Sequence, residues 1–179
     1  MAEKYVDVDT LKYLLYDVHN LEELLVRDRF QDHDKESLDM FIDSVKEFAD
    51  RELFPYVKEM DEHPAYHKDG KVFVHDQVKT MMHKGGEMGL ISAPFNYEDG
   101  GMQIPFLSHT AATYILDAAN NHLPGYAGLT QGAAELIIHF ANKELNQAYV
   151  PNMLTGQWGG TMCLTCLLYT SPSPRDLTA

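Results

Sequence analysis

The chain has 179 residues, 45% of them hydrophobic, which is enough to bury one sizeable core and to begin a second domain. Its 14 basic and 27 acidic residues give a formal net charge of −13 with no offsetting basic patch, which excludes nucleic acid and anionic membranes as partners. The sequence shows no signal peptide and no apolar run of about 18 residues, and its two cysteines lie near the end. We therefore expect a cytoplasmic protein without a membrane span or a disulfide framework.

Two short helices are predicted in the first part of the chain. Asp9 or Thr10 is expected to cap the first helix and Asn20 the second, and the polar residues 27–33 then form a connection. The apolar residues of the two helices recur at three- and four-residue steps and are Leu11, Leu14, Leu15, Val18, Leu21, Leu24 and Leu25.

A long amphipathic helix is predicted to begin at Asp34. Apolar residues alternate with charged ones at helical spacing as far as Leu53. Pro55 ends or kinks this helix, because proline lacks the N–H group and crowds the preceding turn, and residues 56–62 continue at a new angle. The His-Pro and Lys-Asp-Gly-Lys sequences in 63–71 predict a loop or a small hairpin.

Three more helices are predicted in the second half, the first of them at 76–87. Glycines and prolines make residues 89–101 irregular, and two helices rich in alanine and glycine follow, one opening with Pro105 and one ending near Ala141. Small residues let helices approach closely, so this pair is expected to form the middle of a bundle.

The end of the chain changes character after a last helix, which Asn142 is expected to cap. This helix is predicted to end at Val150, because Pro151 and three later glycines disfavour helix. Residues 161–165 then predict a strand.

Several common motifs are missing from the sequence. It contains neither a Gly-x-Gly-x-x-Gly after a strand nor a phosphate-binding loop. Cys163 and Cys166 match Cys-x-x-Cys without the helix start that a redox pair requires. A group of histidines lacks metal-ligand spacing, so we predict no metal site there; these are His63, His67, His75 and His83.

Three short motifs follow one another along the chain. Met88-Gly89-Leu90 is followed by Tyr97-Glu98-Asp99-Gly100-Gly101, then by two alanine-rich helices and Gly159-Gly160-Thr161-Met162-Cys163-Leu164-Thr165. This order resembles the acyl-CoA dehydrogenase family. The resemblance implies a mainly α fold, the N-terminal helical bundle of that family followed by the first strand of a truncated β domain. We assign residues 1–33 to an N-terminal helical extension, 34–157 to the helical domain, 158–165 to the start of the middle β domain, and 166–179 to a non-native tail.

The resemblance also implies a reaction and a cofactor. Family members use FAD to oxidise the Cα–Cβ bond of an acyl-CoA thioester to a trans-2-enoyl-CoA, and a glutamate removes the Cα proton. By motif position, Met162, Leu164 and Thr165 are expected to bind the flavin ring. For Thr165, a plain structural role in a strand is the alternative.

A second set of residues matches the part of the family that lines the acyl pocket. These are Gly125, Ala127, Gly128 and Gln131, and the small side chains among them predict a deep pocket for long or bulky acyl groups. Close helix packing through small residues is the alternative.

The catalytic glutamate of the family belongs to a C-terminal domain, so we assign no catalytic residue in this chain and expect the fragment to be inactive. Four glutamates should not be promoted to the role: Glu87, Glu98, Glu135 and Glu144. An electron-transfer flavoprotein and a homo-oligomeric whole protein are the partners that the resemblance implies. The alternative is a non-enzymatic, acidic helical interaction module.

Overall fold

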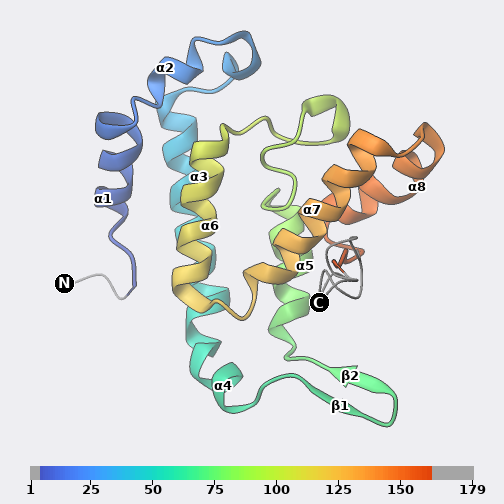
Figure 1. Cartoon of the computed structure of the whole chain (residues 1–179). Coiled ribbons are helices and arrows are strands. Elements are labelled where there is room, and N and C mark those ends of the chain that lie inside the picture. Colours follow the sequence, from blue (N-terminus) through green and yellow to red (C-terminus); the bar gives the residue numbers. More distant parts are fainter. Residues whose placement is uncertain (1–4, 163–179) are drawn as a thin grey trace, which may run out of the picture.

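The computed structural model describes residues 5–162, and most of them are helical (Figure 1). This confirms the predicted mainly α fold. The helices and strands of this part are α1 (Val8–Tyr13), α2 (Glu22–Leu25), α3 (Lys35–Phe48), α4 (Val57–Glu62), β1 (Tyr66–Lys68), β2 (Lys71–Phe73), α5 (Gln77–Glu87), α6 (Phe106–Asn120), α7 (Pro124–Phe140) and α8 (Lys143–Leu154). Within these residues, the helices are all too short or too polar to cross a bilayer.

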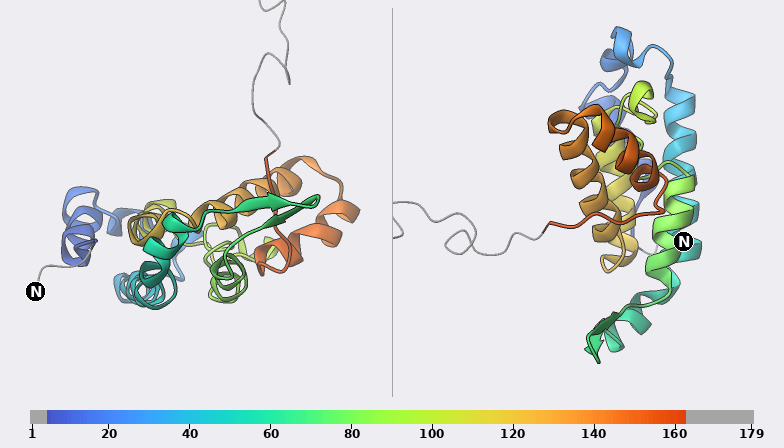
Figure 2. Two further views of the ribbon diagram at one scale, coloured as in Figure 1. Left: turned by 90° about the horizontal axis from the view of Figure 1, so that it is seen from below. Right: turned by 90° about the vertical axis from the view of Figure 1, so that its right-hand side faces the viewer.

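The core lies between α3 and α6 and continues between α5 and α7, as Figure 1 and the turned views of Figure 2 show. Leu38, Ile42 and Val45 of α3 are fully buried, as is Ile115 of α6. The buried face of α6 also carries small side chains, which let the two helices lie close together. These are Ala111, Ala112 and Ala119.

Helix α3 begins where the sequence predicts but ends at Phe48, before the predicted Leu53. The Asp34 carboxylate accepts a hydrogen bond from the Ser37 backbone N–H at 2.7 Å, and the Ser37 hydroxyl accepts one from the Asp34 N–H at 3.0 Å. This reciprocal cap satisfies two donors that would otherwise be free at a helix start. A π-helical turn (Ala49–Leu53) and a 3-10 turn (Phe54–Tyr56) containing Pro55 then lead into α4, so the predicted kink at the proline is confirmed.

Two predicted helix caps are wrong. Asp7, not Asp9 or Thr10, caps α1, and its carboxylate accepts from the Thr10 N–H at 3.1 Å. Asn20 makes no side-chain cap for α2; its φ of 49° instead turns the chain sharply before Leu21. Short polar side chains tolerate this left-handed conformation, and the same property makes them hard to separate from caps by sequence.

The predicted end of α8 is also wrong. The Asn142 cap is confirmed, but the helix runs through Pro151 to Leu154. Proline removes one backbone hydrogen bond and adds a local clash. Val150, Met153 and Leu154 are buried on the same side of the helix, and this packing offsets the cost of the proline.

The segment before α3 is attached to that helix by polar contacts. The Lys12 ammonium donates to Asp43 at 2.8 Å, and the Tyr16 hydroxyl donates to Asp39 at 2.9 Å. Burial and the neighbouring Asp39 raise the pKa of Tyr16 well above its ordinary value, so the tyrosine stays a neutral donor. Three of the apolar residues predicted at helical spacing in this segment differ in burial. Leu15 is buried, whereas Leu14 and Val18 are exposed.

A two-stranded hairpin extends from the helices between α4 and α5 (Figure 1). Tyr66 pairs with Phe73 in an antiparallel register, and Asp69 and Gly70 both have positive φ at the turn. Two successive residues with positive φ form the tight turn that connects the strands of a hairpin. The prediction of a loop or small hairpin is therefore resolved in favour of the hairpin.

Candidate functional site

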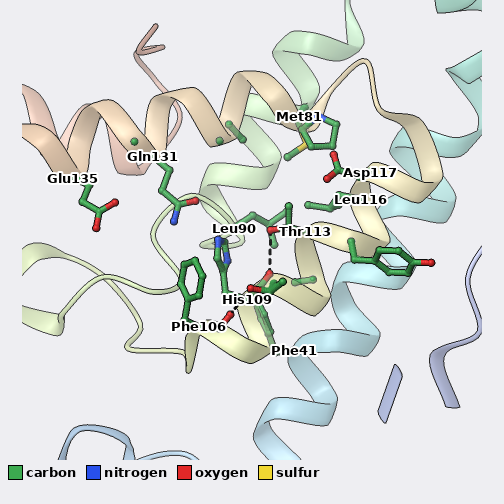
Figure 3. Close-up of a pocket in the computed structure, with 17 residues that line it drawn as sticks. Phe41, Met81, Leu90, Phe106, His109, Thr113, Leu116, Asp117, Gln131 and Glu135 are labelled. Atoms are coloured by element: carbon green, nitrogen blue, oxygen red, sulfur yellow. Dashed lines mark hydrogen bonds between the residues drawn. The ribbon is translucent and has the colours of Figure 1, made fainter. Parts of the chain in front are cut away.

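A cavity of about 580 Å³ lies between α6 and α7, and we call it the α6–α7 cavity (Figure 3). Three of the four predicted acyl-pocket residues line it, namely Ala127, Gly128 and Gln131. Gly125 does not. The other residues that line the cavity are Phe41, Met81, Leu90, Phe106, His109, Thr110, Ala112, Thr113, Tyr114, Leu116, Asp117, Pro124, Gly132 and Glu135.

The glycines of α7 leave space on the side of that helix that lines the cavity. A Cβ atom added at Gly125, Gly128 or Gly132 would have no heavy atom within 4 Å among the described residues, apart from the adjoining residues and backbone of α7 itself. A glycine inside a helix costs about 0.5–1 kcal/mol relative to alanine, so a packing contact would be the usual reason for one. Residues 5–162 provide no such contact at these three positions, and two of them, Gly128 and Gly132, widen the cavity.

Two polar side chains face each other across the cavity. His109 projects from α6 and Gln131 from α7, and both side chains point into the space between the two helices (Figure 3). Burial lowers the pKa of His109, while the neighbouring Gln131 amide opposes this shift, so the imidazole is held in its neutral form. One turn along α6, the Thr113 hydroxyl donates to the His109 carbonyl oxygen at 3.0 Å.

Two carboxyl groups complete the polar part of the cavity. Asp117 lies two turns beyond His109 on α6, and burial raises the pKa of its carboxyl. Glu135 lies one turn beyond Gln131 on α7 and is exposed (Figure 3). Glu135 also borders a neighbouring smaller cavity of about 200 Å³ that reaches Arg29.

The sequence analysis missed His109, Thr113 and Asp117. Their spacing of four residues places them on one side of α6, and that pattern was visible in the sequence. It could not be separated from an ordinary solvent-facing stripe, because only the position of α7 turns this side of α6 into a cavity wall.

Another side of α7 holds the segment that follows α8. The Gly160 N–H donates to the Thr130 hydroxyl at 3.0 Å, and that hydroxyl donates to the Tyr126 carbonyl oxygen at 2.7 Å. A Cβ at Gly160 would lie 2.6 Å from the Ala133 Cβ. The chain is therefore fixed against α7 just before the predicted flavin-binding residues.

Two other glycines hold the same segment against α5. Any side chain at Gly86 would collide with the backbone of Thr155, and any side chain at Gly156 would collide with the Met82 carbonyl. We call residues 155–160 the glycine connector. This connector passes between α5 and α7, and no residue larger than glycine fits at these contacts.

Of the three predicted flavin-binding residues, the structure describes only Met162. Its side chain is 56% exposed, and neither it nor Thr161 belongs to a regular element. The first two residues of the predicted 161–165 strand are thus not in a strand, whereas Leu164 and Thr165 lie outside the described residues, as does the rest of the predicted strand.

The histidine group does not assemble into a metal site. Within residues 5–162, no three histidine, cysteine, aspartate or glutamate side chains are placed to hold a metal ion. His75 instead lies 3.4 Å from Glu59 and accepts a hydrogen bond from the Gln77 backbone N–H.

Comparison with known families identifies the class of protein. Residues 35–157 match the family model described as the acyl-CoA dehydrogenase, N-terminal domain. This match covers more than half of the chain, so the chain belongs to the acyl-CoA dehydrogenase family.

Two curated relatives illustrate the range of the family. The chain is 31% identical over 98 residues to 3-methylmercaptopropionyl-CoA dehydrogenase of Ruegeria pomeroyi, covering 55% of this chain and 17% of that protein. It is 27% identical over 128 residues to the long-chain specific mitochondrial acyl-CoA dehydrogenase of Rattus norvegicus, covering 71% of this chain and 27% of that protein. The chain thus spans about a quarter or less of the length of these relatives.

A solved structure shares the fold. It was determined in work titled "Electron transferring flavoprotein of Acidaminococcus fermentans: Towards a mechanism of flavin-based electron bifurcation". The two chains are 26% identical, with a TM-score of 0.51 over 69% of this chain and 30% of the other.

Proposed function

We propose that the protein to which this chain belongs is an FAD-dependent dehydrogenase that converts an acyl-CoA thioester to the trans-2-enoyl-CoA. The observation that supports this proposal is the arrangement of α7. One side of the helix lines a large cavity of mixed apolar and polar character, and another side fixes the glycine connector that leads to Met162. Substrate and cofactor would thereby be held by one rigid element.

The described residues are compatible with a flavin beside α7. Beyond Gly160 the chain is exposed, and Thr161 and Met162 make no backbone hydrogen bond to another described residue. Such N–H and C=O groups are suited to bind the polar edge of the flavin ring, and Leu164 and Thr165 would continue this contact. When bound, FAD supplies the hydride acceptor for the reaction.

In this proposal the chain's own residues bind and orient the acyl group. Ala127, Gly128 and Gly132 provide the room, and Phe41, Leu90 and Leu116 provide apolar contact that excludes water. No acidic residue of the chain is assigned as the base that removes the Cα proton. Glu135 borders the cavity but is exposed and has no resolved partner that would fix it near the substrate.

The open wall of α7 also supports a preference for long or bulky acyl groups. We expect Ala127→Leu in the whole protein to reduce kcat/KM for long acyl-CoA substrates by more than tenfold and to affect short ones little. Gly128→Leu should act in the same direction, and its side chain would enter open space without disturbing the fold. Steady-state kinetics with a series of chain lengths tests this, and an equal loss at every length would contradict it.

We further propose that residues 1–179 alone neither retain FAD tightly nor turn over acyl-CoA, because only Met162, Leu164 and Thr165 are assigned to the flavin and no residue is assigned as the catalytic base. The visible absorbance of the purified chain and a dye-reduction assay test this directly. A stoichiometric flavin spectrum, or reduction of the dye by acyl-CoA, would show the proposal to be wrong. In the whole protein, an electron-transfer flavoprotein is the proposed electron acceptor, and a homo-oligomer is the proposed assembly.

A further inference from the structure

We propose that the α6–α7 cavity selects acyl groups that carry a neutral hydrogen-bonding group, such as a hydroxyl or keto oxygen. Plain aliphatic acyl groups and those ending in a carboxylate would bind less well. This inference rests on the proposed function, in which the cavity receives the acyl chain.

His109 and Gln131 have more hydrogen-bonding groups than a contact between them can use. A neutral imidazole has one donor and one acceptor nitrogen, and a glutamine amide has both a donor and an acceptor group. At most one hydrogen bond can join the two side chains, so at least one imidazole nitrogen and one amide group stay available to a ligand. Both residues line the cavity and face its interior (Figure 3).

A ligand that fills the cavity removes solvent from the polar groups of His109 and Gln131. In the unfilled cavity, the spare groups of His109 and Gln131 are only half-buried and so can reach solvent. An acyl chain that displaces this water leaves them unpaired unless the chain offers a partner. Leaving one such group unpaired costs about tenfold in affinity. A hydroxyl or keto oxygen placed beside His109 and Gln131 removes that cost.

The charged residues around the cavity disfavour an anionic ligand. Asp117 and Glu135 both line the cavity, and the described residues that line it include no lysine or arginine. A ligand carboxylate would therefore meet only like charge, with no cation to pair with it. The cavity thus favours a neutral polar group over an anionic one.

Three pantetheine thioesters of equal length test the proposal on the chain as it stands. One carries a plain octanoyl group, the second a single hydroxyl on the distal half of the chain, and the third a terminal carboxylate. Binding is followed by NMR titration of the His109 imidazole. We expect the hydroxylated thioester to bind about tenfold more tightly than the plain one, and the carboxylate to bind most weakly.

Variants separate recognition from plain packing. Gln131→Met keeps the length of the side chain but removes its polar groups, and we expect it to abolish the preference for the hydroxyl. His109→Phe, followed through the Gln131 side-chain amide, should do the same. Gln147→Met, at an exposed position of α8, is the matched control and should leave the preference intact.

Equal binding of the plain and hydroxylated thioesters, binding of none of the three, or a preference that survives both cavity variants would overturn the inference. The measurement requires neither flavin nor turnover. A whole protein that binds no flavin would therefore refute the proposed reaction while leaving the selective binding to be judged on these titrations.

Discussion

The backbone of Gly160 lies against α7 with no room for a side chain. Its N–H donates to Thr130, whose side chain is fully buried, and Ala133 closes the other side. The sequence indicated that Gly159 and Gly160 end helical structure. It could not indicate the contact with Thr130, because that contact joins residues 30 positions apart and depends on how α7 and α8 pack.

Gly160→Ala should destabilise the fold by about 1–3 kcal/mol, since the new methyl group would press on Ala133 and displace the connector. The same substitution at Gly128 is the control. It is expected to stabilise α7 by about 0.5–1 kcal/mol, because that position is helical and open. Urea unfolding of the two variants gives the comparison, and equal stability changes would contradict the structure.

At the scale of the elements, the sequence predicted best where local chemistry decides. The cap at Asp34, the kink at Pro55 and the hairpin around Asp69-Gly70 all follow from a few neighbouring residues. The passage of α8 through Pro151 was missed because buried side chains outweigh the local cost of the proline.

The cap of α3 makes a prediction about pH. Hydrogen bonds from the Ser37 backbone and side chain lower the pKa of Asp34 below its ordinary value of 3.8. The folded state therefore takes up this proton at lower pH than the unfolded state does. The contribution of Asp34 is present above pH 3.8 and is lost as the pH falls through the lower, folded pKa.

Asp34→Asn should keep the cap but remove this dependence, since asparagine caps helices without titrating. We expect the loss of stability between about pH 5 and about pH 3 to be smaller in this variant than in the unsubstituted chain. Asp32→Asn, at an exposed aspartate just before the cap, serves as the control. An unchanged slope in Asp34→Asn would refute the role of the carboxylate.

At the scale of the whole molecule, one side of α7 carries large apolar side chains in solvent. Leu129, Leu136 and Phe140 are 45%, 59% and 84% exposed, and Tyr149 of α8 and Trp158, whose rings contact each other, are exposed as well. Apolar surface of this kind is uncommon on a self-sufficient monomer. It favours the interpretation of the chain as part of a larger enzyme over that of an independent interaction module.

The chain on its own should consequently self-associate as its concentration rises. Leu136→Ser combined with Phe140→Ser should shift it toward the monomer, as measured by light scattering after size-exclusion chromatography. Val72→Ser with Phe73→Ser removes comparable exposed side chains from the hairpin and should have less effect. A strictly monomeric unsubstituted chain would instead support the interaction module.

The glycine connector has a practical consequence for building hybrid enzymes. Its three contacts, at Gly86, Gly156 and Gly160, fix both the path and the number of residues between α8 and whatever follows. Inserting or deleting a residue there would move at least one glycine off its contact and place a side chain where none fits. A recombination junction inside residues 155–160 should therefore give hybrids that do not fold with most partner sequences. A junction placed just after Gly160 would carry all three glycine contacts into the hybrid.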